Sequence, residues 1–210
     1  MQFQAVLFDC DGVLVDSEPI TIGVLRDMLA EAGWAMPLAE CLQRFVGHTV
    51  RSQAALIESH TGAPLTDAWM ARFYARRDAQ LHARLQPMAG ALQAVQAAHA
   101  ATGGRIACAS GADLGKVRLQ LAKTGMAEWF GPHVFSGHEL PRSKPFPDVY
   151  LAAADALGTP AGQCLVIEDT PTGIRAGKAA GATVWALAPD AAAAPALRAA
   201  GADAVFGQMD

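Results

Sequence analysis

Short apolar runs recur along the chain, and segments with helical periodicity separate most of them. The runs are nearly continuous in apolar residues, whereas a strand with one solvated face alternates apolar and polar residues. Continuous runs of this length are typical of strands buried on both faces. The pattern therefore predicts an α/β fold in which helices cover both faces of a parallel sheet. The runs are Ala5–Phe8, Arg105–Ala109, His133–Phe135, Cys164–Ile167, Thr183–Leu187 and Ala204–Phe206.

Helices are expected directly after several of these runs. The segments 114–125, 147–158 and 170–181 each end at a glycine, and the last two open at or next to a proline. Both features are common at helix ends. In a parallel sheet, the loops after the strands and the first turns of the following helices gather at one edge, where ligands bind. Functional residues are therefore expected at the carboxyl ends of the predicted strands.

Residues 17–87 interrupt the alternation of strand and helix. Helical patterns occupy 20–33, 51–59 and 67–82, and no convincing strand lies among them. We therefore expect a small all-helical domain inserted after the first strand. The predicted domains are an α/β core formed by residues 1–16 and 88–210, and the helical insert formed by residues 17–87.

The charge balance argues against nucleic-acid and membrane partners. The chain has 16 Lys and Arg against 20 Asp and Glu, a formal net charge of −4, whereas phosphate backbones and acidic lipids select clustered basic residues. The uncharged stretch 85–104 contains Gln and His residues and is not expected to span a membrane. No basic segment with a long apolar run precedes Asp9, so we expect no secretory signal and a cytoplasmic location. We also expect a monomer.

Acidic side chains follow two of the predicted strands. Asp9 and Asp11 come at the end of the first strand, and Glu168–Asp169 come at the end of the fourth. The first pair alone is equally consistent with an Asp-Gly turn that ends a strand. Together, these acids would crowd one edge of the sheet, where two bare charges 4 Å apart repel by about 4 kcal/mol at an effective dielectric constant near 20. We therefore expect a divalent cation among them, and oxygen ligands favour Mg²⁺.

Two further elements are suited to binding a phosphate. Ser110–Gly111 ends the second predicted strand where a helix is about to begin, and it offers a hydroxyl and backbone N–H groups. Lys144 lies between Ser143 and Pro145 in a segment that the prolines restrict. Taken singly, these residues are better explained without a ligand, Ser110 as a helix N-cap and Lys144 as a solvated surface lysine.

The ordered set of motifs resembles the haloacid dehalogenase-like superfamily, in particular its branch of phosphatases and β-phosphoglucomutase-like enzymes. The set is Asp-x-Asp-Gly after the first strand, Ser after the second, Lys-Pro after the third and Glu-Asp after the fourth. The resemblance covers essentially the whole chain. It implies a Rossmann-like three-layer core with a parallel sheet, and it implies that the helical insert is a cap domain.

The resemblance also implies roles for the motif residues. Asp9 would attack phosphorus and form an aspartyl phosphate, while Asp11 would protonate the leaving alcohol and later deprotonate water. Mg²⁺ would be held by Asp9, the backbone carbonyl of Asp11 and Asp169. Glu168 would either bind the ion directly or contact the groups that bind it. Ser110, Gly111 and Lys144 would bind the phosphate, although Gly111 stands where many relatives have Asn.

Cap residues are expected to choose the substrate. Thr49, Arg51, Arg76 and Arg77 are candidates for this contact. The alternative interpretation is ordinary helix-surface charge, and we expect it to hold for at least two of the four.

The resemblance predicts a Mg²⁺-dependent phosphatase that hydrolyses a small phosphorylated metabolite, either a sugar phosphate or a sugar-acid phosphate. The contexts of 134–137 and 142–145 are similar to those of 6-phosphogluconate phosphatases. A phosphosugar mutase is the alternative, but such mutases carry a histidine where this chain has Thr21. A 2-haloacid dehalogenase, which would not need Asp11 or the Glu168–Asp169 pair, and a non-catalytic phosphate-binding module are further alternatives.

Overall fold

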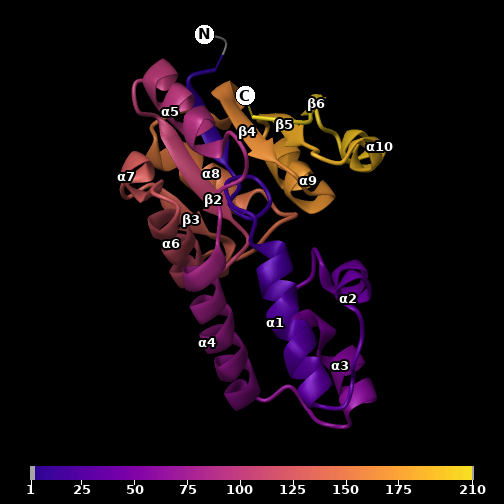
Figure 1. The fold of residues 1–210 in the computed structure, drawn as a ribbon. Coiled ribbons are helices and arrows are strands. Elements are labelled where there is room, and N and C mark those ends of the chain that lie inside the picture. The colour runs from indigo at the N-terminus through magenta and orange to yellow at the C-terminus, as the bar shows by residue number, and fades with distance from the viewer. Residues whose placement is uncertain (1–2, 210) are drawn as a thin grey trace. The chain divides into compact units, whose positions relative to one another are not determined.

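The chain divides into two compact units. The computed structural model describes residues 3–209. One unit contains the chain up to Asp16 and from Gln86 onward, and the other is Ser17–Leu85. We call the first unit the core and the second the cap (Figure 1).

The core contains one six-stranded sheet in which every neighbouring pair of strands is parallel. The strand order is β3-β2-β1-β4-β5-β6, which places the two acid-bearing strands, β1 and β4, side by side at the centre. Each strand coincides to within one residue at either end with an apolar run, so the predicted α/β fold with a parallel sheet is confirmed. The strands are β1 (Ala5–Phe8), β2 (Ile106–Ser110), β3 (Val134–Ser136), β4 (Cys164–Glu168), β5 (Thr183–Leu187) and β6 (Ala204–Phe206).

Helices cover both faces of this sheet and make three layers. Ala5 and Leu7 point into an apolar cluster that α8, α9 and α10 complete. On the other face, the ring of Phe8 packs edge-on against Phe130 of α7, with centroids 6.0 Å apart, and α5 and α6 contact α7 in the same layer (Figure 1). The helices are α5 (Ala91–Thr102), α6 (Leu114–Lys123), α7 (Ala127–Phe130), α8 (Asp148–Ala156), α9 (Pro171–Ala179) and α10 (Ala194–Ala199). Single 3₁₀ turns are η2 (Gly137–Glu139), η3 (Ala161–Gln163) and η4 (Ala191–Ala193).

All regular secondary structure in the cap is helical. Its apolar cluster includes Leu25, Cys41 and Phe73, and Trp34 stacks on His60 with ring centroids 3.9 Å apart. The elements are α1 (Glu18–Glu31), α2 (Leu38–Phe45), η1 (Val50–Gln53), α3 (Ala54–Thr61) and α4 (Asp67–Arg84). Across residues 3–209, no helix combines the length and apolarity needed to cross a bilayer.

Candidate active site

Asp9 and Asp11 lie where β1 ends and the chain turns sharply. The backbone N–H of Asp9 still donates to the carbonyl of Ile167 on β4 at 2.9 Å, and Asp9 is only 6% exposed. Gly12 follows with a φ of +79°, and a Cβ there would lie 2.0 Å from Oδ2 of Asp169. The turn therefore requires glycine for its backbone conformation and for the room it leaves to the Asp169 carboxylate.

Lys144 connects the acids of the two central strands. Its Nζ donates to Oδ1 of Asp9 and, at 2.7 Å, to Oε1 of Glu168. The ammonium also lies 4.8 Å from the centre of the Tyr150 ring. The side chain of Lys144 is 8% exposed, so the interpretation as a solvated surface lysine is wrong. Its cation offsets part of the repulsion between the acids, and that repulsion alone therefore does not require a metal ion.

Glu168 accepts hydrogen bonds on both oxygens. Oε1 also accepts from the hydroxyl of Tyr150 on α8 at 2.9 Å. Oε2 accepts from the backbone N–H groups of Asp169 at 2.9 Å and Thr170 at 3.0 Å, and from the Thr170 hydroxyl at 3.0 Å. Gly173 packs so closely against this carboxylate that a Cβ there would be 1.6 Å from Oε1. The start of α9 is thus shaped around an ionised Glu168.

These contacts move the pKa values of the two acids in opposite directions. Burial raises the pKa of Asp9 to about 7, with Lys144 opposing the shift and Glu168 adding to it. Burial also acts to raise the pKa of Glu168, but the charge and hydrogen bond of Lys144 and the N–H of Thr170 outweigh it and lower that pKa. Burial acts to lower the pKa of Lys144, yet the carboxylates of Asp9 and Glu168 hold it well above its usual range. Without a further cation, Asp9 is therefore the acid that holds a proton more readily.

The acids fit a hard divalent cation. One carboxylate oxygen from each of Asp9, Glu168 and Asp169 lies within 4.8 Å of the others. All these candidate ligands are oxygens, the type that Mg²⁺ prefers. The absence of a side chain at Gly12 leaves room for the Asp169 carboxylate beside the β1 turn. Asp169 can therefore act as a metal ligand there.

Ser110 and Gly111 lie at the same edge of the sheet. β2 pairs with β1 so that Cys108 is opposite Phe8, and Ser110 is therefore at the level of the β1 turn. Ser110 is buried, and its Oγ accepts from the N–H of Ala112 at 3.0 Å. The N-cap of α6 is instead Asp113, whose Oδ1 accepts from the N–H of Lys116 at 2.9 Å. The interpretation of Ser110 as the helix cap is therefore wrong.

Some residues at the site carry almost no signal in the sequence. Lys116 and Gln120 of α6 both donate to the Asp11 carboxylate. Their only signal in the sequence is that they flank Val117 and Leu121 on the apolar side of the predicted helix. Tyr150 gave no signal beyond its place in an apolar helix face.

The four cap candidates have different surroundings. The hydroxyl of Thr49 caps η1 by accepting from the N–H of Ser52 at 3.2 Å. Arg51 pairs with Asp67 at 2.7 Å and Arg76 pairs with Glu31 at 2.6 Å, and these arginines are exposed. Arg77 is only 5% exposed, bonds to Asp78 at 2.8 Å and lies over the Tyr74 ring. The surroundings of Arg77 favour a packing role, whereas the two exposed arginines remain candidates for contact with the substrate.

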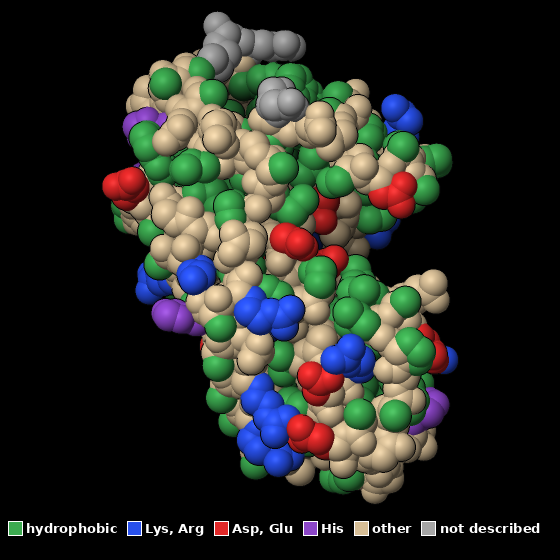
Figure 2. All heavy atoms as spheres, in the orientation of Figure 1, with side chains coloured by type: hydrophobic (Ala, Val, Ile, Leu, Met, Phe, Trp, Pro, Cys, Tyr) green, Lys and Arg blue, Asp and Glu red, His purple; other side chains and the backbone are tan. Residues whose placement is uncertain are grey.

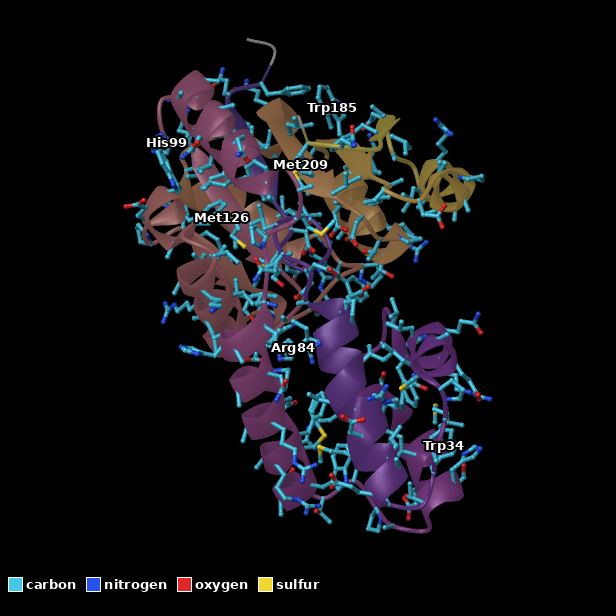
Figure 3. All side chains as sticks on the ribbon, viewed as in Figure 1. Trp34, Arg84, His99, Met126, Trp185 and Met209 are labelled. Carbon is cyan, nitrogen blue, oxygen red and sulfur yellow. The ribbon has the colours of Figure 1, made fainter. Side chains whose placement is uncertain are left out.

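A groove of about 550 Å³ lies between α1 and α4 within the cap. Three arginines line it, Arg26, Arg76 and Arg84, together with two acids, Asp27 and Glu31. Figure 2 shows this mixture of basic and acidic side chains on the cap surface, and Figure 3 marks Arg84 at the end of α4. Arg26 pairs with Asp27 and Arg76 with Glu31, which leaves Arg84 as the additional cation of the groove.

Comparison with known proteins shows matches over most of the chain. Residues 3–181 match the haloacid dehalogenase-like hydrolase family. A 6-phosphogluconate phosphatase of Escherichia coli is 28% identical over 190 residues, which cover 90% of this chain and 84% of that protein. A phosphoglycolate phosphatase of Rhodospirillum rubrum is 34% identical over 195 residues, covering 86% and 78%. The crystal structure of a hydrolase of the same family from Deinococcus radiodurans, with bound phosphate and sodium, is 35% identical with a TM-score of 0.79, covering 99% and 92%.

Proposed function

Because the chain belongs to the haloacid dehalogenase-like hydrolase family, we propose that it is a Mg²⁺-dependent phosphatase that acts through an aspartyl phosphate on Asp9. The observation that carries this proposal is the contact of Lys144 with both Asp9 and Glu168 at the ends of β1 and β4. It combines a nucleophile with a cation able to neutralise a phosphoryl oxygen.

In the first step, a carboxylate oxygen of Asp9 bonds to phosphorus as the bond from phosphorus to the substrate alcohol breaks. Asp11 gives a proton to the leaving oxygen. Lys144, with Ser110 and the N–H groups after it, holds the phosphoryl oxygens. In the second step, Asp11 takes a proton from water, which attacks phosphorus and releases phosphate from Asp9. Together, the two steps return the side chains to their starting states.

Asp9, the backbone carbonyl of Asp11 and Asp169 would hold Mg²⁺. When bound, the ion would supply positive charge to the phosphoryl group and favour the ionised form of Asp9. Glu168 accepts hydrogen bonds from protein groups on both oxygens, and we assign it mainly to holding Lys144 in place.

The substrate is a small phosphorylated metabolite. The names of the relatives, 6-phosphogluconate phosphatase and phosphoglycolate phosphatase, support an acid that carries a phosphate ester. The additional positive charge at Arg84 in the cap groove is consistent with a second anionic group on the substrate. Thr21 of α1, in place of the mutase histidine, favours water as the phosphoryl acceptor.

The test is a panel of sugar phosphates and sugar-acid phosphates with Mg²⁺, in which both inorganic phosphate and organic products are measured. We expect steady release of phosphate, none in Asp9→Asn, and loss of activity in EDTA. Formation of an isomeric phosphate without release of phosphate would instead establish a mutase. Turnover of 2-chloropropionate that survives EDTA would establish a dehalogenase, and normal rates in Asp9→Asn would eliminate the covalent mechanism.

A further inference from the structure

Two side chains of α6 hold the carboxylate of Asp11. Nζ of Lys116 donates to both oxygens, at 2.8 Å to Oδ1 and 2.9 Å to Oδ2. Nε2 of Gln120 donates to Oδ1 at 2.7 Å. Lys116 and Gln120 are one helical turn apart and therefore lie on the same face of α6. They form a preassembled pair of donors rather than two chance contacts.

The amide of Gln120 is held in one orientation. Its Oε1 accepts a hydrogen bond from Sγ of Cys10 at 3.3 Å, while its Nε2 donates to Asp11. Exchange of the amide oxygen and nitrogen would lose both contacts, and Gln120 is completely buried, at 0% exposure, where such a loss is costly. Lys116 is also buried, at 8% exposure. The donors facing Asp11 are thus fixed by the packing of α6.

We propose that Lys116 and Gln120 are positioning residues that hold Asp11 where it exchanges a proton with the leaving group and with water. This inference rests on the proposed function. Asp11 lies in the turn after β1, where an isolated bridge to Val15 pairs its backbone but no strand or helix contains it, so its carboxylate is held by groups from elsewhere in the fold. Displacement of an acid by about 1 Å costs on the order of 100-fold in rate.

The position of α6 in the chain connects the phosphate-binding residues with the residues that hold Asp11. Ser110 ends β2, and α6 begins at Leu114. The phosphate-binding serine therefore lies just before α6, and the donors for Asp11 lie in the first and second turns of that helix. A movement of α6 would displace phosphate contacts and Asp11 together.

A positioning role differs from a purely structural role in its dependence on the leaving group. An alkyl phosphate needs a proton from Asp11 when its alcohol leaves. 4-Nitrophenyl phosphate does not, because 4-nitrophenolate leaves without protonation at neutral pH. A structural defect would slow attack by Asp9 on both substrates, whereas loss of positioning would slow this first step only for the alkyl phosphate.

The experiment compares Lys116→Met and Gln120→Leu with the wild type in single-turnover reactions with Mg²⁺. For a sugar phosphate, we expect the rate of phosphoryl transfer to fall about 10- to 100-fold with little change in KM. For 4-nitrophenyl phosphate, we expect the first release of 4-nitrophenolate to stay within about threefold of the wild type, because its leaving group needs no general acid. Its steady-state turnover should slow, since Asp11 must still activate water. Lys116→Arg should restore much of the lost rate.

Lys123→Met is the matched control, because it makes the same side-chain change on the same helix at an exposed position. It should leave both substrates unaffected. Equal losses on the two substrates, or no loss in either variant, would overturn the positioning role. Thermal unfolding checks each variant, and Gln120→Leu keeps the test open if Lys116→Met does not fold. Asp9→Asn is run alongside: phosphate release in that variant would overturn the proposed function itself, a result separate from the substrate ratio.

Discussion

A Cβ on Gly173 would lie 1.6 Å from Oε1 of Glu168, inside the space that this carboxylate occupies. Glu168 has no room to withdraw, because both its oxygens are bonded to protein groups. We therefore expect Gly173→Ala to destabilise the protein by about 3 kcal/mol or more and to remove most of the activity. The free energy of unfolding from urea titration measures the first effect, and phosphate release measures the second.

The control for this substitution is Gly23→Ala on α1, where a Cβ meets no atom within 4 Å. In a helix, this change is expected to raise stability by about 0.5–1 kcal/mol. The two substitutions add the same methyl group and should change the free energy of unfolding in opposite directions. Equal effects would show that Gly173 is not shaped to the Glu168 carboxylate.

The second prediction concerns pH and Asp9. In the folded, metal-free protein the pKa of Asp9 is about 7, compared with an ordinary value of 3.8. Between these values, the folded state binds a proton that the unfolded state has released, so this group's contribution to stability falls as pH rises from about 4 to 7 and is constant above. The variant Asp9→Asn has no carboxyl group at this position and does not lose this stability. The free energy of unfolding of Asp9→Asn relative to the wild type should therefore increase by roughly 2–4 kcal/mol from pH 4 to 8 in EDTA.

Unfolding titrations of both proteins across this pH range test the second prediction. Mg²⁺ at pH 8 should reduce the difference, since a bound cation stabilises the ionised carboxylate of the wild type. Parallel pH profiles for the two proteins would contradict the raised pKa.

Several parts of the fold could be predicted because they depend on local sequence. The strands were visible as apolar runs, and the acids directly after β1 and β4 were visible as charges at the ends of those runs. The strand order was not predicted, because pairing of β1 with β4 joins segments that lie far apart in the sequence. Helix α5 was also missed, since its polar positions carry Gln and His and no charged face marks it.

The site shows the same division between local and non-local information. Asp9 and Ser110 were found from their place after a strand, although their chemical roles remain predictions. The contacts of Lys116 and Gln120 with Asp11 depend on how α6 packs against the β1 turn, which no sequence spacing encodes. Arg77 shows the same limit for a charged side chain. The alternative interpretation as helix-surface charge is wrong for it, because its side chain is buried against Tyr74, and its contact with substrate stays a prediction.

The third prediction concerns the metal. Mg²⁺ at 100 times its Kd should stabilise the wild type by about 2.7 kcal/mol, and EDTA should reverse the effect. Asp169→Asn replaces a charged ligand with a neutral one and should weaken binding, so that the shift in Tm at the same Mg²⁺ concentration is lost. Asp155→Asn, an exposed aspartate on α8, is the matched control and should keep the full shift. A normal shift in Asp169→Asn would place the ion elsewhere.

The fourth prediction concerns the cap groove. Within residues 3–209, Arg84 lines the groove but forms no ion pair, whereas Arg76 is paired with Glu31. An anionic group of the substrate would therefore bind Arg84 without displacing an internal partner. We expect Arg84→Ala to raise KM about 5- to 30-fold for phosphate esters that also carry a carboxylate, which corresponds to one charged hydrogen bond. Esters without the carboxylate should be affected less, and kcat should change little.

The matched control is Arg72→Ala, which removes an exposed arginine from the same helix at a position outside the groove. It should leave KM unchanged for both classes of ester. Arg76→Ala should have an intermediate effect, because it removes a groove cation but also frees Glu31, whose negative charge then opposes an anionic substrate. If Arg84→Ala and Arg72→Ala change KM equally, the effect comes from the overall charge of the cap, and the groove does not select the substrate.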